Sequence, residues 1–220
     1  MRGLFARERI LTAIERVLTT FGRDPAEARG GSTLGVRLCE WAERVLDWNR
    51  RIDLTAARSV EELIDLLVAD AAFVAGLLPE DAGPAWVDVG SGAGAPGLAL
   101  ALLKPSLAMT LVEPKAKRVA FLRSTLGALE RSDVRVERRR VEELPDSDWD
   151  VAISRATLEP SSWLEQGARI ARRRIWVLLA QGGPPTAPGL QIVADGRYDW
   201  PLTGLSRRAV AYEPIPSKAE

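Results

Sequence analysis

The stretch WVDVGSGAGAPGLALAL, residues 86–102, decides the fold of this chain. It begins as an apolar run of strand length, passes through a turn rich in glycine, and continues as the apolar start of a helix. Glycine permits a sharp turn and lets a ligand approach the backbone closely, because it has no Cβ atom. The stretch therefore predicts a strand, a ligand-binding turn and a helix in succession.

The sequence downstream continues this alternation of strands and helices. A second strand is expected at 108–113, followed by a helix at 115–129, and further strands are expected at 134–138, 149–154, 174–180, 190–200 and 208–214. Strands joined by helices form right-handed parallel units. The last two strands are joined by the turn-like PLTGLS, so they most simply form an antiparallel edge. The pattern predicts an α/β fold with a doubly wound, mostly parallel sheet.

The first part of the chain shows helical spacing instead. Apolar residues recur at helical intervals over 11–18 and again over 38–48, and Ser59 precedes VEEL as a helix N-cap. Trp41 and Trp48 lie on one such face, which favours packing over base stacking. We expect residues 1–80 to form an N-terminal helical extension and residues 81–220 to form the main, cofactor-binding domain.

Composition excludes several classes of function. The 220 residues are 46% hydrophobic, which is enough for a sizeable core, and 30 basic residues balance 30 acidic ones. Binding to nucleic acid therefore has to come from local patches. With one cysteine, Cys39, and no histidine, disulfide, metal and histidine-based chemistry are poor expectations. Charges interrupt the apolar residues of the N-terminal segment, so we expect a cytoplasmic protein with no membrane contact.

The ligand of the glycine turn is the central question. The glycine spacing over 92–97 also fits the dinucleotide fingerprint of an NAD-dependent oxidoreductase, and a purely structural turn is a further alternative. Asp88, two residues before Gly90, would repel a pyrophosphate but would attract the ammonium group of S-adenosylmethionine. Glu113 ends the next strand, where an acid accepts hydrogen bonds from ribose hydroxyls. Because no residue pattern for hydride transfer follows, S-adenosylmethionine is the favoured cofactor.

Three later segments allow two interpretations each. Val141 and Glu142 could border an adenine, or the acidic residues there could begin a helix. Arg155 ends the fourth strand of the main domain, where open parallel sheets place ligands, although a solvated surface arginine is the alternative. The arginine clusters at 135–140 and 169–175 could contact phosphates or form structural ion pairs.

Six short segments, in order, resemble the RsmG (GidB) family of ribosomal RNA methyltransferases. They are DWNRRIDLTAARSVEELI (47–64), VDVGSGAGAPG (87–97), TLVEPKAKRVAFLR (110–123), RVEELP (140–145), ISRA (153–156) and GLSRRAVAYEP (204–214). The resemblance implies a Rossmann-like methyltransferase fold. It also implies methyl transfer from S-adenosylmethionine to guanine N7 of 16S ribosomal RNA, within the small subunit or its assembly intermediate.

The resemblance, together with the pattern, also implies which residues act. The expected cofactor contacts are Asp88, Gly90, Gly92, Ala95, Glu113, Val141, Glu142 and Arg155. Lys115, Lys117 and Arg118 are expected on the face that meets RNA. Guanine N7 carries a lone pair and no proton, so no general base is required and no catalytic residue is assigned.

Several polar residues of the family are replaced in this chain. Leu66 and Leu67 stand where the family has Arg and His, Ala71 replaces Ser, Gln181 replaces Lys and Asp53 replaces Asn, whereas Asp70 remains. These replacements keep a second interpretation open. It is a divergent relative that binds S-adenosylmethionine but is inactive or acts on another substrate.

Overall fold

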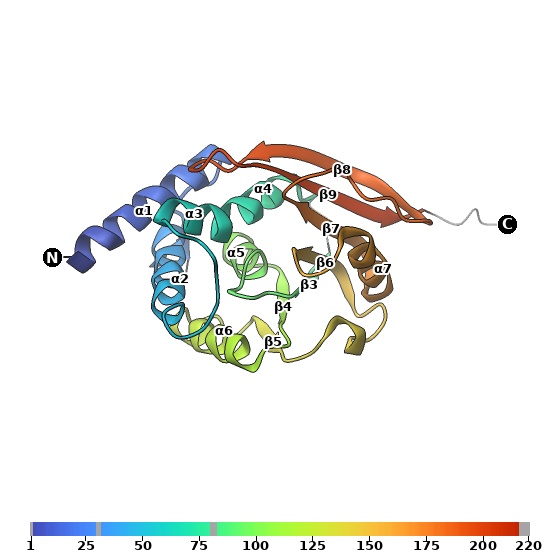
Figure 1. The fold of residues 1–220 in the computed structure, drawn as a ribbon, viewed down its shortest axis with the longest axis horizontal. Coiled ribbons are helices and arrows are strands. Elements are labelled where there is room, and N and C mark those ends of the chain that lie inside the picture. Colours follow the sequence, from blue (N-terminus) through green and yellow to red (C-terminus); the bar gives the residue numbers. More distant parts are fainter. Residues whose placement is uncertain (1, 30–31, 80–82, 216–220) are drawn as a thin grey trace.

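The structure is a computed structural model that describes residues 2–29, 32–79 and 83–215. Its helices are α1 (Arg2–Thr20), α2 (Leu34–Trp48), α3 (Val60–Ile64), the π-helix η1 (Asp65–Ala69), α4 (Asp70–Leu77), α5 (Gly97–Leu103), α6 (Ala116–Ala128), the 3₁₀-helix η2 (Val141–Glu143) and α7 (Pro160–Ile170). Its strands are β1 (Ala28–Arg29), β2 (Ser32–Thr33), β3 (Ala85–Val89), β4 (Ala108–Val112), β5 (Arg135–Glu137), β6 (Trp149–Arg155), β7 (Ala171–Leu179), β8 (Leu190–Asp199) and β9 (Ser206–Pro214). Figure 1 shows their arrangement.

Seven strands form one sheet in the order β5-β4-β3-β6-β7-β9-β8. The pairs from β5 to β7 are parallel, whereas β9 pairs antiparallel with both β7 and β8. The predicted doubly wound sheet with an antiparallel C-terminal edge is therefore confirmed. The antiparallel pair β1 and β2 was not predicted. It lies inside a segment that was expected to hold only helices and breaks. Two residues per strand are too few to show an alternating pattern.

Alternate residues of the central strands enter two separate cores. Trp86 and Ile153 pack with α5 on one face of the sheet, whereas Val87 and Ala152 pack with α7 on the other. This follows from the strand geometry, since successive side chains point to opposite faces. Helices α1, α2 and α4 contribute to the same core as α5, and Figure 1 shows them on that side of the sheet. Helices α2 and α4 therefore lie beside α5, and Trp41 of α2 also reaches the glycine turn.

The helix signals in the N-terminal part are confirmed. Ser59 caps α3 by accepting a hydrogen bond from the backbone of Glu62 at 3.1 Å. The chain then runs through α3, η1 and α4 without leaving helical conformation, which brings Asp65 and Asp70 into the interior. Over the described ranges, no helix is both long enough and apolar enough to cross a membrane.

Candidate functional site at the carboxyl ends of the parallel strands

The glycine turn lies where β3 ends. Gly90, Gly92 and Gly94 have φ angles of 76°, 55° and 107°, a region that favours glycine. The N–H of Gly90 donates to the carbonyl of Val112 at 2.8 Å, which ties the turn to β4. A Cβ atom added to Gly90 would lie 2.0 Å from Oγ1 of Thr157. The turn thus packs against the segment after β6 more closely than any side chain at this position would allow.

Helix α2 supports the same turn from the N-terminal side. The buried indole of Trp41 donates from Nε1 to the carbonyl of Ala93 at 3.0 Å. Ala95 is buried in the turn two residues later. The packing role predicted for Trp41 is therefore confirmed, and this residue fixes the backbone of the expected cofactor loop.

Asp88 lies beneath the turn and is 1% exposed. Its Oδ2 accepts the N–H of Gly97 at 3.0 Å, whereas Oδ1 has no hydrogen-bond partner among the described residues. Burial raises the pKa of this carboxyl to about 7, and the Gly97 N–H and the charge of Arg155 lower it in part. Asp88 therefore holds the start of α5, and one of its oxygens is left as an acceptor.

The raised pKa of Asp88 predicts how stability depends on pH. Its pKa in the unfolded chain is about 3.9, so between about pH 4 and pH 7 the folded state binds more protons than the unfolded state. Stability from this group is therefore present at low pH and is lost as pH rises, by at most about 1.4 kcal/mol per pH unit. In melting curves from pH 5 to pH 8, the wild type should lose stability relative to Asp88→Asn as pH rises. Parallel pH profiles for the two proteins would contradict this expectation.

Glu113 follows β4 and is 2% exposed. Its Oε2 accepts the N–H of Gly92 at 3.0 Å, and its Oε1 accepts the N–H of Lys115 at 2.9 Å. Nη1 of Arg118 lies 3.9 Å from Oε2. Each carboxylate oxygen can accept more than one hydrogen bond, so Glu113 can hold the turn and still receive two hydroxyl groups.

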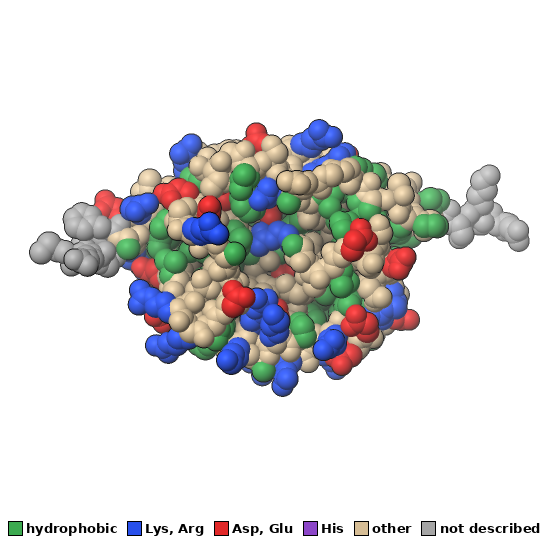
Figure 2. Space-filling view, in the orientation of Figure 1, with side chains coloured by type: hydrophobic (Ala, Val, Ile, Leu, Met, Phe, Trp, Pro, Cys, Tyr) green, Lys and Arg blue, Asp and Glu red, His purple; other side chains and the backbone are tan. Residues whose placement is uncertain are grey.

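A cavity of about 330 Å³ opens beside these groups. It is lined by Val89, Gly90, Val112, Pro114, Lys115, Arg139, Arg140, Val141, Glu142, Thr157 and Leu158. The volume lies in the usual range for small-molecule sites, and apolar walls next to a few polar groups are typical of them. Figure 2 shows one face of the molecule hollowed near its centre, with both basic and acidic side chains around the hollow. Sequence reasoning missed Pro114, Thr157 and Leu158, although each follows the end of a parallel strand.

Helix η2 confirms that the acidic residues begin a helix, whereas the place of Val141 and Glu142 beside an adenine stays a prediction. Oε2 of Glu143 accepts the N–H of Arg140 at 2.9 Å and so caps the turn, whereas Val141 and Glu142 line the cavity. The carbonyl of Val141 accepts a hydrogen bond of 2.7 Å from Nη2 of Arg169, which holds η2 against α7. Arg169 belongs to the second arginine cluster, in which Arg169, Arg172 and Arg174 form ion pairs with Asp146, Asp150 and Glu213.

Arg155 also lies at the carboxyl edge of the sheet, as the last residue of β6. Its Nη1 donates to Oδ2 of Asp70 at 2.7 Å and to the carbonyl of Leu66 at 2.7 Å. Its side chain is 19% exposed. The arginine is therefore held by the N-terminal helices rather than solvated.

The three expected RNA contacts differ in their surroundings. Lys115 is exposed and lines the cavity, and Lys117 is exposed on α6. Arg118 is more constrained, since its Nε and Nη2 donate to the carbonyl of Asp53 at 3.1 and 2.9 Å. Arg118 thus joins the loop after α2 to the neighbourhood of Glu113.

The replaced family positions fall mainly in the interior. Leu67 and Ala71 are buried in the core, and Leu66 is half-buried with its carbonyl bound to Arg155. Gln181 is exposed after β7. The first three replacements therefore fill a helix face with apolar side chains, which suits their buried positions.

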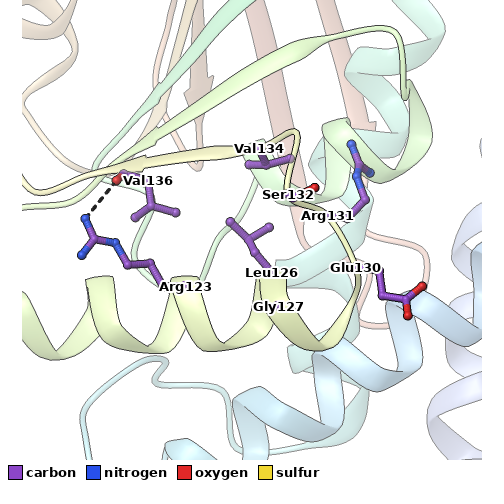
Figure 3. A pocket seen from close by; sticks show the side chains of 8 residues that line it. All are labelled: Arg123, Leu126, Gly127, Glu130, Arg131, Ser132, Val134 and Val136. Atoms are coloured by element: carbon purple, nitrogen blue, oxygen red, sulfur yellow. Dashed lines mark hydrogen bonds between the residues drawn. The ribbon is translucent and has the colours of Figure 1, made fainter.

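A second cavity, of about 340 Å³, lies between the C-terminal half of α6 and β5. Figure 3 shows Leu126, Val134 and Val136 clustered there, with Arg123 donating to the carbonyl of Val136 at 3.3 Å. Nearby, Arg131 donates to the carbonyl of Ala101 at 2.7 Å. Because α6 leads away from the end of β4, this cavity lies at the far end of the helix from Lys115.

Comparison with known families gives a match over residues 36–185 to the family described as rRNA small subunit methyltransferase G (GidB). A relative of that name from Halorhodospira halophila is 43% identical over 133 residues, which cover 60% of this chain and 62% of the relative. Another from Myxococcus xanthus is 31% identical over 193 residues, covering 81% of this chain and 88% of the relative.

Solved structures share the fold. A putative methyltransferase from Escherichia coli has a TM-score of 0.52 at 14% identity, covering 75% of this chain and 92% of that one. A SAM-dependent methyltransferase from Aquifex aeolicus has a TM-score of 0.51 at 18% identity, covering 69% of this chain and 92% of that one. The predicted Rossmann-like methyltransferase fold is thus confirmed.

Proposed function

Because this chain belongs to the rRNA small subunit methyltransferase G family, we propose that it transfers a methyl group from S-adenosylmethionine to N7 of a guanine in 16S ribosomal RNA. The substrate is the RNA within the small subunit or its assembly intermediate. Zero net charge supports a structured particle over free RNA, since no global field would hold an extended strand.

One observation carries the cofactor assignment. Glu113, the glycine turn and a cavity with apolar walls meet at the carboxyl ends of β3 and β4. The free lone pairs of Glu113 suit the two ribose hydroxyls, and Val141 and Leu158 suit the faces of an adenine. The unpartnered Oδ1 of Asp88, buried beneath the glycine turn, is the acceptor that we propose for the ammonium group of the amino acid moiety. The residues present therefore fit S-adenosylmethionine.

Further residues complete the proposed site. Gly90 and Glu142 line the cavity, whereas Gly92 and Ala95 belong to the same turn without lining it. Arg155, at the end of β6, is proposed to lie between the cofactor and the incoming base. Residues 1–80 are proposed as a helical extension that builds one wall of the substrate entrance on the domain formed by residues 81–220.

The reaction requires the methyl group and guanine N7 to be positioned, and it requires no proton transfer. Bound S-adenosylmethionine supplies an electrophilic methyl group, and guanine N7 offers a lone pair that bears no proton. The protein's task is then to align the two groups and exclude water, which can supply about 7–11 kcal/mol of the barrier. No side chain is required as a general base, in agreement with the absence of histidine from the sequence.

On the RNA side, Arg118 is proposed to order the loop that contains Asp53. Arg118→Met removes two hydrogen bonds to that loop, so we expect KM for the ribosomal substrate to rise about 10-fold. Amide hydrogen exchange over residues 49–58 should become faster. Lys117→Met is the matched control because it removes an exposed cation from the same helix.

The two variants separate positioning from charge. Lys117→Met should mainly reduce the salt dependence of KM, with a slope lower by about one, and leave exchange in the loop unchanged. If Arg118→Met leaves exchange over 49–58 unchanged as well, Arg118 does not order the loop and the proposed positioning role is refuted.

The direct test of the proposed function is methyl transfer from labelled S-adenosylmethionine to small ribosomal subunits from cells that lack the modification. After digestion to nucleosides, label is expected in 7-methylguanosine. Label in another nucleoside would refute the proposed target atom. No label, with S-adenosylhomocysteine still bound, would favour the divergent relative without this activity. Displacement of S-adenosylhomocysteine by NAD would refute the cofactor assignment.

A further inference from the structure

A buried carboxylate joins three distant segments next to the proposed site. Asp70, at the start of α4, is 2% exposed, and its Oδ2 accepts from Nη1 of Arg155 at 2.7 Å. Its Oδ1 accepts from the hydroxyl of Tyr198 at 2.8 Å and from Nε1 of Trp200 at 2.6 Å. A buried charge is tolerated only when it is paired and hydrogen-bonded, and Asp70 meets both conditions.

The partners of Asp70 are themselves immobilised. Tyr198 stacks on Phe73 with ring centroids 4.0 Å apart, and the guanidinium of Arg207 lies 3.8 Å from the centroid of the Trp200 ring. Burial and the charge of Asp70 raise the pKa of Tyr198 far above its usual value, so the phenol stays protonated and donates. Tyr198 and Trp200, in the C-terminal hairpin, therefore fix the position of the Asp70 carboxylate through their hydrogen bonds.

Arg155 keeps donors for a ligand. Nη1 is used by Asp70 and by the carbonyl of Leu66, whereas no described residue accepts a hydrogen bond from Nε or Nη2. The side chain is partly exposed, and its charge acts on Asp88 beneath the glycine turn. The Nε and Nη2 donors of Arg155 thus remain open to a ligand at the carboxyl edge of the sheet.

The chemistry of guanine limits what such an arginine can do. A guanine edge presents O6 and N7 side by side, and a free arginine normally binds both. Here N7 must remain open to the methyl group, and the ring becomes cationic when N7 is alkylated. An unpaired arginine would therefore block the reacting atom and oppose the charge that develops.

We propose that Asp70 is a positioning residue that, with Tyr198 and Trp200, holds Arg155 so that its remaining donors bind guanine O6 and leave N7 free. The carboxylate also offsets the positive charge of Arg155 as the ring becomes cationic. This inference rests on the proposed function, since it assigns the residues that present the base in that reaction.

The first test is Asp70→Asn. An asparagine keeps an acceptor for the C-terminal hairpin but loses the charge and places N–H groups where the carboxylate accepted. We expect kcat for 7-methylguanosine formation to fall about 10- to 100-fold, as for loss of a charged hydrogen bond. The dissociation constant for S-adenosylhomocysteine should change less than kcat does, because Arg155 is the one expected cofactor contact that Asp70 holds and the residues lining the cavity are untouched.

Asp65→Asn is the matched control. Asp65, in η1, is a buried acid like Asp70. It accepts hydrogen bonds from the backbone N–H and the hydroxyl of Thr203, in the same hairpin, at 2.8 Å each, and it does not contact Arg155. The substitution Asp65→Asn should lower the melting temperature without changing kcat of the folded protein. Equal losses of kcat in both variants would overturn the inference, because a purely structural role predicts that outcome.

A double-mutant cycle shows whether Asp70 acts through Arg155. In the Arg155→Met background, Asp70→Asn should cause no further loss of kcat, whereas independent effects would multiply. Multiplied losses in the double variant would overturn the inference.

A second measurement does not depend on activity. Amide hydrogen exchange should become faster over residues 154–158 in Asp70→Asn, but not in Asp65→Asn. Unchanged exchange there would overturn the inference even if the wild-type enzyme is active. If the wild type forms no 7-methylguanosine while exchange responds as expected, the proposed function fails and the link between Asp70 and Arg155 stands.

Discussion

Gly90→Ala should lower the affinity for S-adenosylhomocysteine about 100-fold. The new Cβ would lie 2.0 Å from Oγ1 and 2.5 Å from Cγ2 of Thr157, and the φ angle of 76° is itself unfavourable for alanine. Strain of this kind costs about 1–3 kcal/mol, and the displaced segment borders the cavity. Titration calorimetry measures the loss, and a thermal melt shows whether the protein is still folded.

Gly92→Ala provides the control for that experiment. Its φ angle of 55° is also left-handed, but the nearest atom to an added Cβ lies 3.8 Å away. The expected cost is about 1 kcal/mol of backbone strain, or roughly 5-fold in affinity. Equal losses in the two variants would show that left-handed strain, rather than the contact with Thr157, sets the demand for glycine at position 90.

Glu113→Ala is expected to lower the same affinity about 100- to 1000-fold. The change leaves the N–H groups of Gly92 and Lys115 without their acceptor and removes the acid proposed for the ribose. Each hydrogen bond to a charged group contributes about 1.5–3 kcal/mol, so the turn and the ligand contact weaken together. Calorimetry with S-adenosylhomocysteine measures the combined loss of affinity.

Glu143→Gln separates this effect from the loss of any carboxylate near the cavity. Glu143 also accepts a backbone N–H in a turn, from Arg140, but it is exposed and does not line the cavity. The affinity of the Glu143→Gln variant for S-adenosylhomocysteine should remain within about 3-fold of that of the wild type. An affinity of Glu113→Ala close to that of Glu143→Gln would contradict the role proposed for Glu113.

The parts of the site that the sequence predicts are those encoded locally. The glycine turn and Glu113 stand directly after apolar strand runs, so their place at one edge of a parallel sheet follows from chain order. Val141 and Glu142 reach the cavity for the same reason. The roles of Gly90 and Glu113 toward the cofactor stay predictions that the binding experiments above test, and those of Val141 and Glu142 stay predictions as well.

The parts that could not be predicted depend on contacts between distant residues. Asp70 and Trp200 are 130 positions apart, and Arg118 meets the carbonyl of Asp53 from 65 positions away. No periodicity encodes such pairs, because each depends on how the N-terminal helices pack on the sheet. The resemblance to a family showed that Asp70 is retained in its motif, but it assigned Asp70 no role and no hydrogen-bond donors.

The hydrogen bonds from Tyr198 and Trp200 to Asp70 also set an order of events during synthesis. The glycine turn, Glu113 and Arg155 are all translated before residue 198. Until the β8–β9 hairpin forms, the carboxylate of Asp70 lacks two of its three side-chain donors in an otherwise apolar interior. A nascent chain that ends before residue 198 lacks both donors and cannot complete the hydrogen bonds that hold Asp70 against Arg155, so the proposed alignment of the substrate is completed last.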